Sequence, residues 1–89
     1  MVDHPMSDRL KMMAGKPARP LSTARAGERV RLLLVQGGRG IRQRLSEMGL
    51  LPGVEFTIVS NAVPGPVTIA IGGTRLLLGR GMVHRIMVA

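Results

Sequence analysis

The chain has 89 residues, 13 basic and 5 acidic side chains, a formal net charge of +8 and no cysteine. This length allows a single domain at most, and the lack of cysteine excludes disulfides, cysteine-ligated metal centres and a thiol nucleophile. Phe56 is the only aromatic residue, which argues against a barrel that stacks single-stranded nucleic acid on several rings. No apolar run exceeds four residues and the N-terminus lacks an apolar signal segment, so we expect a cytoplasmic protein.

Residues 1–20 have the composition of a flexible tail. They contain three prolines, a glycine and scattered charges, and polar and apolar residues do not alternate. Ser7 is a suitable N-cap for a helix over residues 8–14, but a helix of this length is not stable alone in water. We therefore place the folded domain at residues 21–89.

Beyond residue 20, short apolar runs broken by glycine and proline predict β-strands. In several of these runs apolar side chains alternate with polar or small ones, which turns one face of each strand inward. Gly72 and Gly73 supply two residues free to adopt positive φ, as a tight hairpin requires. The expected strands are residues 30–35, 54–60, 67–71, 74–78 and 85–88. Five short strands predict a mainly β fold, a small bent barrel without exposed edges.

Residues 40–48 interrupt the β pattern and predict one short helix. Ile41, Leu45 and Met48 recur at helical spacing and form a single apolar stripe. The predicted barrel therefore has a helix inserted between its first two strands.

The end of this helix is specified by its own sequence. Gly49 suits the left-handed position just past the helix, and Leu50 can then fold back onto Leu45 as in a Schellman cap. In the next residues Pro52 fixes φ and Gly53 accepts a positive φ. This pair predicts a type II turn that leads into the second strand.

The ten residues from Arg44 to Gly53, RLSEMGLLPG, resemble the RL-x-x-(M/L)-G-(L/I)-x-x-G core of the FeoA family. The flanking residues are similar to the family pattern in the same order, so that the likeness covers residues 21–88. These flanking matches are Leu21, Ala26-Gly27-Glu28, Pro64-Gly65-Pro66, Leu76-Leu77-Leu78-Gly79, Ile86 and Val88.

FeoA proteins are small cytosolic proteins that accompany the bacterial ferrous-iron transporter FeoB. The resemblance implies an SH3-like β-barrel with a helix between the first two strands. It also implies a non-enzymatic role in ferrous-iron uptake through contact with cytosolic parts of the transporter. The same barrel occurs as the C-terminal domain of iron-dependent repressors. No winged-helix segment precedes the barrel here, so we do not expect a complete repressor.

The titratable side chains of the predicted barrel do not form a catalytic set. Glu28, Glu47 and Glu55 lack the spacing of a carboxylate dyad, and no nucleophile, base and orienting group can be combined. His84 is typical of a surface residue, and His4 suits only adventitious Cu(II) or Ni(II) binding. We predict that the protein is not an enzyme and has neither a metal site nor a cofactor.

The glycines at 37, 38 and 40 precede the predicted helix and admit two interpretations. Backbone N–H groups at a helix start can bind an anion, with Arg39 and Arg42 as side-chain partners. The segment nevertheless lacks the lysine of a phosphate-binding loop and the spacing of a dinucleotide fingerprint. We favour a flexible connection between strand and helix.

Arginines are concentrated around the predicted helix. Such guanidinium groups suit an acidic protein surface or a nucleic-acid backbone, or they only keep a small apolar domain solvated. The arginines that lie within sixteen positions of one another are Arg29, Arg31, Arg39, Arg42 and Arg44.

Our candidate partner-binding residues are Arg39, Arg42, Arg44 and Leu51, because Leu51 at the first turn position can stay exposed beside the basic side chains. We expect the partner to be the cytosolic region of FeoB, with the membrane reached only through it, and no stable nucleic-acid complex. One alternative is a basic nucleic-acid-binding barrel, motivated by the net charge. Another is a free-standing metal-sensing or dimerising module, motivated by the likeness to the repressor domain.

Overall fold

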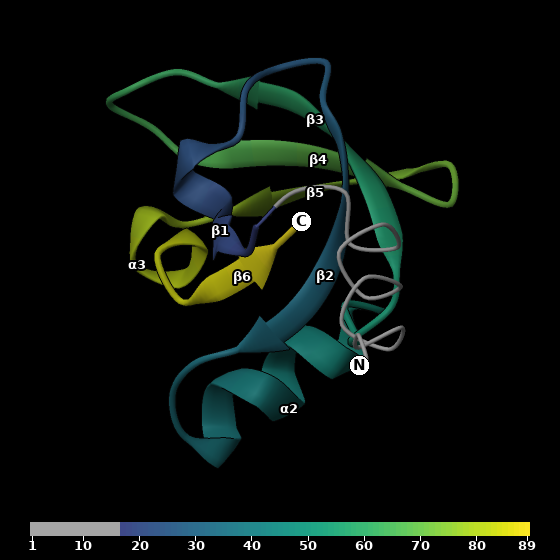
Figure 1. The fold of residues 1–89 in the computed structure, drawn as a ribbon, viewed down its shortest axis with the longest axis vertical. Coiled ribbons are helices and arrows are strands. Elements are labelled where there is room, and N and C mark those ends of the chain that lie inside the picture. Colours follow the sequence, from purple (N-terminus) through teal and green to yellow (C-terminus); the bar gives the residue numbers. More distant parts are fainter. Residues whose placement is uncertain (1–16) are drawn as a thin grey trace, which may run out of the picture.

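The computed structural model describes residues 17–89, whose strands form an antiparallel sheet that curls into a barrel (Figure 1). In the sheet the strands follow the order β1-β6-β2-β3-β4-β5. The elements in chain order are β1 (Arg19–Pro20), the 3-10 helix η1 (Leu21–Thr23), β2 (Arg29–Val35), α2 (Arg39–Glu47), β3 (Glu55–Asn61), β4 (Val67–Ile71), β5 (Thr74–Leu78), α3 (Arg80–Val83) and β6 (Ile86–Val88).

Strand β2 belongs to both halves of the barrel. Its first residues, Arg29 to Arg31, pair with β3, whereas its last residues, Leu32 to Val35, pair with β6. The register shifts between Leu32 and Leu34, which marks a β-bulge, a feature that bends and twists a strand. Figure 1 shows the long curved course of β2, which ends next to α2. The bulge therefore lies where the helix joins the barrel.

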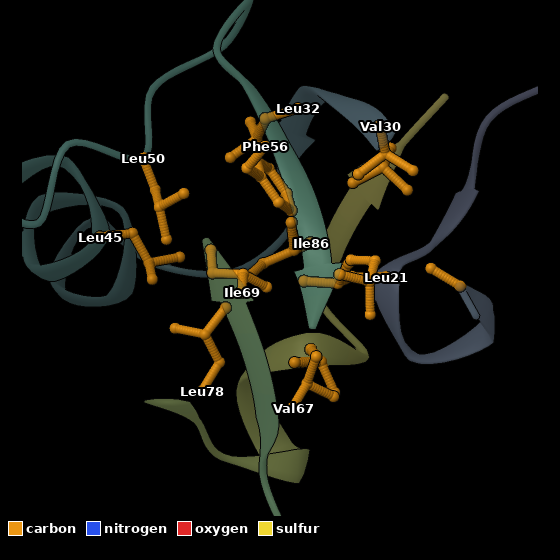
Figure 2. Packing of buried hydrophobic residues seen from close by; sticks show 14 of the residues in the cluster. Leu21, Val30, Leu32, Leu45, Leu50, Phe56, Val67, Ile69, Leu78 and Ile86 are labelled. Atoms are coloured by element: carbon orange, nitrogen blue, oxygen red, sulfur yellow. The ribbon is translucent and has the colours of Figure 1, made fainter. Parts of the chain in front are cut away.

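The interior of the described part is apolar and contains no buried polar or charged residue. Figure 2 shows Leu45 and Leu50 pointing from α2 and from the segment after it toward the strands. Because burial of a leucine side chain contributes about 1.5–3 kcal/mol, these two residues fix the helix on the barrel. The buried residues are Leu21, Ala24, Val30, Leu32, Val35, Leu45, Leu50, Phe56, Ile58, Val67, Ile69, Leu78, Val83, Ile86 and Val88.

The structure confirms the mainly β fold with its inserted helix. Each of the five predicted strands and the predicted helix agrees with the structure to within one residue at either end. In the β4–β5 hairpin, Gly72 and Gly73 have φ of 55° and 86°, so both adopt the positive φ that the tight turn requires.

The number of strands is corrected from five to six. Strand β1 has only two residues, too few to show any periodicity, and its Pro20 pairs with Met87 of β6. The sheet thus begins at Arg19, before the boundary expected at residue 21. Helix α3, with four residues, is likewise too short to give an apolar stripe. The expected helix over residues 8–14 lies outside the described residues.

Candidate partner-binding groove

A groove with a volume of about 600 Å³ lies between α2 and the end of β2. It combines apolar side chains from β2 and from the turn after α2 with polar and cationic side chains of the helix. The lining residues are Leu34, Val35, Arg39, Arg42, Gln43, Ser46, Leu50, Leu51 and Pro52. Three of the four predicted site residues, Arg39, Arg42 and Leu51, therefore meet at one surface, whereas Arg44 does not line it.

Leu34 reaches the groove because of the bulge in β2. Strict alternation would place it on the inner face together with Val30 and Leu32, which are 3% and 0% exposed. The register shift buries Val35 instead and leaves Leu34 48% exposed. Sequence reasoning missed this residue, and the only signal for it is that the three leucines at 32–34 do not alternate with polar residues.

The segment that carries Leu51 is anchored first by the end of α2. The N–H of Leu50 donates to the carbonyl of Leu45 at 2.9 Å, and the N–H of Gly49 donates to the carbonyl of Ser46 at 3.0 Å. These are the two hydrogen bonds of a Schellman cap, and Gly49 has the required positive φ of 90°. The predicted cap is confirmed.

The following turn fixes Leu51 from its other side. The N–H of Val54 donates to the carbonyl of Leu51 at 3.1 Å, and Gly53 has φ of 95°, as expected for a type II turn. The N–H of Gly53 also donates to the carbonyl of Leu32 at 2.7 Å, which ties the turn to β2. Leu51 is therefore held by ordered backbone, although its side chain is 49% exposed.

Close packing explains the first glycine of the connection between β2 and α2. Gly37 has φ of 132°, and a Cβ atom there would lie 3.0 Å from Cγ2 of Ile41 and 3.1 Å from a guanidinium nitrogen of Arg85. Residue 37 must therefore be small and tolerate a positive φ. The sequence reasoning did not identify this structural role, which requires no bound anion.

Arg39 and Arg42 lie one helical turn apart on α2. The Nε atom of Arg42 donates to the carbonyl of Val35 at 3.3 Å, which links the helix to the end of β2. Neither arginine forms an ion pair with a carboxylate of residues 17–89. Within the described part of the chain, both positive charges beside the groove are therefore uncompensated.

Arg29 and Arg31, at the other end of β2, share one carboxylate. Glu55 on the neighbouring strand β3 lies 2.7 Å from a guanidinium nitrogen of Arg31 and 3.2 Å from Nε of Arg29. Hydrogen bonds from Arg31, and then from Arg29, lower the pKa of Glu55. Two of the five predicted arginines therefore share one carboxylate, whereas two others, Arg39 and Arg42, line the groove.

In the described part of the chain, the other titratable side chains do not gather around a metal position. Glu28 pairs with Arg19 at 2.7 Å and also accepts a hydrogen bond from the backbone N–H of Arg25. Within residues 17–89 there is no group of three histidine, aspartate or glutamate side chains that could hold a metal ion. In the same range, none of the helices has the length and hydrophobicity needed to cross a bilayer.

A bent strand is shared by two halves of a sheet, a helix follows it, and a groove lies between them. These features define a small SH3-like barrel with a groove on its surface. A comparison with family models matches residues 19–89 to the FeoA domain. The chain belongs to the FeoA family. This confirms the resemblance drawn from the motif at residues 44–53.

Comparisons with individual proteins agree with this assignment. The chain is 38% identical over 69 residues to a protein of Methanocaldococcus jannaschii provisionally named Fe(2+) transport protein A, covering 78% of this chain and 83% of that protein. The crystal structure of an iron uptake regulatory protein (FeoA) is 34% identical with a TM-score of 0.75, covering 83% of this chain and 97% of the other.

The SH3-like fold also occurs in larger proteins. The structure of a manganese-dependent transcriptional repressor matches with a TM-score of 0.76 and 18% identity, covering 83% of this chain and 41% of the repressor. At this identity the likeness concerns the fold alone.

Proposed function

We propose that the protein is a non-enzymatic accessory protein of ferrous-iron uptake that binds a cytosolic region of the transporter FeoB through the groove. Membership of the FeoA family and the names of two relatives support the role in iron uptake. The observation that carries the binding surface is the position of exposed Leu34 and Leu51 beside Arg39 and Arg42. Both cations are without a carboxylate partner among residues 17–89.

The chemistry of the groove specifies the kind of segment that fits it. A large apolar side chain of the partner would displace water from Leu34, Leu51 and Pro52. A carboxylate next to that side chain would meet Arg39 or Arg42, and guanidinium groups bind carboxylates through two parallel hydrogen bonds that also fix orientation. We therefore expect an apolar anchor flanked by acidic residues on the cytosolic side of the transporter.

The structure favours a protein partner over nucleic acid. Arg29 and Arg31 are already paired with Glu55, so they contribute less to a field that would attract phosphates. Phe56 is 1% exposed inside the barrel and cannot stack on a base. The alternative of a metal-sensing or dimerising module is supported only by a shared fold.

Binding of the purified chain to full-length FeoB in detergent, measured by isothermal titration calorimetry, tests this proposal. Leu51→Ser changes an anchor in the groove and should weaken binding about tenfold, the effect of losing a central interface residue. Leu33→Ser is the matched control, since Leu33 is an exposed leucine that does not line the groove.

The outcomes distinguish the identity of the partner from the location of the binding surface. Failure of the unaltered chain to bind FeoB would contradict the function. Binding that Leu51→Ser leaves unchanged would retain the partner and contradict the groove.

A further inference from the structure

Strand β5 forms an open edge of the sheet among the described residues, so the expectation of a barrel without exposed edges was wrong at this strand. In the strand order β1-β6-β2-β3-β4-β5 it pairs with β4 on one side, and its other side has no strand among the described residues. The opposite edge is different, because β1 has two residues and one of them is Pro20. Short strands and prolines are common protections of sheet edges. The five residues of β5 include no proline, and their register with β4 is unbroken.

The hydrogen-bond pattern shows which residues of β5 have backbone groups directed outward. The N–H of Ile58 donates to the carbonyl of Glu28, and its carbonyl accepts from the N–H of Gly27, so both groups point toward the β2 side. Backbone groups alternate in direction along a strand, so those of the adjacent Thr57 point toward β4. Thr57 pairs with Ala70, so the backbone groups of Ala70 point toward β3. The backbone groups of its chain neighbours, Ile69 and Ile71, therefore point toward β5.

Continuing this alternation across the hairpin places Ile69 opposite Leu76 and Ile71 opposite Thr74 in hydrogen-bonded pairs. The N–H and C=O groups of Arg75 and Leu77 then point away from β4. Neither residue takes part in a backbone hydrogen bond outside the strand ladder in residues 17–89. Two donors and two acceptors thus line this edge in the spacing that an added antiparallel strand needs.

The side chains at this edge add specificity. Arg75 and Leu77 lie on the outer face of the sheet, Leu77 with 67% exposure, while Leu78 is fully buried on the inner face. Arg75 has no ion pair within the described part of the chain. An added strand would therefore place one side chain near a cation and another near an exposed leucine.

We propose that the β5 edge binds an extended, acidic segment of another protein, which adds to the sheet as an antiparallel strand. A carboxylate of that segment pairs with Arg75, and an apolar residue covers Leu77. Charge favours this occupant over a second copy of the chain, because two copies would each bring a net charge of +8 to the contact. The surface is separate from the groove, since no residue of β5 lines the groove.

Synthetic peptides test this proposal by ¹⁵N NMR on the full chain. The probe is the eight-residue peptide Glu-Thr-Val-Thr-Glu-Thr-Val-Thr, which presents glutamate and valine in turn on one face of a strand, and its control has lysine in place of each glutamate. We expect the glutamate peptide to shift the amide signals of Arg75 and Leu77 and to slow their hydrogen exchange. The lysine peptide should leave both unchanged.

Three variants separate backbone pairing from charge. Leu77→Pro removes an N–H that points away from β4 and forms no hydrogen bond with that strand. The fold should therefore persist while peptide binding is lost. Leu77→Thr keeps that N–H and should retain binding to within about fivefold, since only an exposed apolar contact is reduced. Arg75→Glu should weaken the glutamate peptide about tenfold and create binding of the lysine peptide.

Three results would overturn the proposal. The first is a glutamate peptide that shifts the amides of Leu34 and Leu51, at the groove, instead of those of β5. The second is equal binding of both peptides. The third is a dimer in analytical ultracentrifugation that Leu77→Pro dissociates, which would assign the edge to a second copy.

Discussion

The two ends of β2 differ in how their neighbouring arginines are compensated. At the first end, Arg29 and Arg31 share the carboxylate of Glu55 across the β2–β3 pairing. At the other end, Arg39 and Arg42 lie on α2 beside a groove, without a carboxylate partner in residues 17–89. Both pairs are arginines, so the difference arises from the neighbouring elements. Strand β3 supplies a carboxylate at the first end, and no described residue supplies one at the other end.

This difference shows that the net charge alone does not indicate where the uncompensated cations lie. At the ion-paired end, the nearby carboxylate offsets the basic side chains, and such exposed pairs contribute little to stability or recognition. At the groove end, uncompensated cations coincide with half-exposed leucines held by ordered backbone. The second combination places arginine, a residue enriched among the anchors of protein interfaces, beside exposed apolar side chains.

The largest effect is expected where α2 meets the core. Leu45 is fully buried, and Leu45→Ala should lower the free energy of unfolding by about 3 kcal/mol, because a cavity remains where the side chain packed. Urea denaturation measures this loss. The control Arg44→Ala changes an exposed neighbour on the same helix and should shift stability by less than about 0.5 kcal/mol. Equal losses in the two variants would contradict packing of α2 through Leu45.

Two glycines near α2 should respond with opposite signs. Gly49 has φ of 90°, so Gly49→Val should destabilise the protein by about 2 kcal/mol through backbone strain. Gly40 lies inside α2 and a Cβ there meets nothing within 4 Å, so Gly40→Ala should stabilise by about 0.5 kcal/mol. Thermal denaturation compares both with the unaltered chain. An unchanged melting temperature for Gly49→Val would refute the left-handed cap.

Adjacent leucines of β2 provide a finer test of the groove. Leu34 lines it, whereas Leu33 is exposed but does not. Leu34→Ser should weaken binding to FeoB about fivefold while Leu33→Ser leaves it within about twofold, since only one of the two would contact the partner. Calorimetric titration of both variants measures the difference. Similar weakening by the two would place the contact on the strand as a whole.

The smallest effect concerns the ion-paired end and depends on pH. Hydrogen bonds from Arg31 and Arg29 lower the pKa of Glu55 in the folded protein. The ionised carboxylate therefore stabilises the fold above the ordinary glutamate pKa of about 4.3, and this contribution is lost as pH falls through the lower, folded-state pKa.

Glu55→Gln removes this contribution. Below about pH 4.3 the melting temperature of the unaltered chain should consequently fall more steeply than that of the variant. The two melting curves are compared at matched ionic strength, because salt screens exposed pairs. Parallel pH dependence of the two proteins would show that the pairs do not couple to folding.

Backbone conformations that only certain residues adopt made much of the groove predictable from sequence. Gly49 and Gly53 each occupy a position that demands positive φ, and Pro52 fixes the turn between them. Once the cap and turn are predicted, the exposure of Leu51 follows from its place between them. The hairpin at Gly72 and Gly73 is predictable for the same reason.

Features that depend on pairing between distant segments were not predictable. Leu34 is exposed because β2 bulges between two partner strands, and nothing within the strand sequence specifies where its register shifts. The contact of Glu55 with Arg29 and Arg31 depends on the β2–β3 register. Strand β1 pairs with the opposite end of the chain, and two residues contain no period from which to infer that pairing.

We propose that the groove, rather than total positive charge, binds the transporter. The most direct measurement compares Arg39→Gln/Arg42→Gln with Arg29→Gln/Arg31→Gln, since each double variant removes two positive charges. Calorimetric titration against full-length FeoB at one ionic strength should show about tenfold weaker binding for the first and at most about twofold for the second. Equal weakening would assign the interaction to net charge, and unchanged binding of the first variant would contradict the groove.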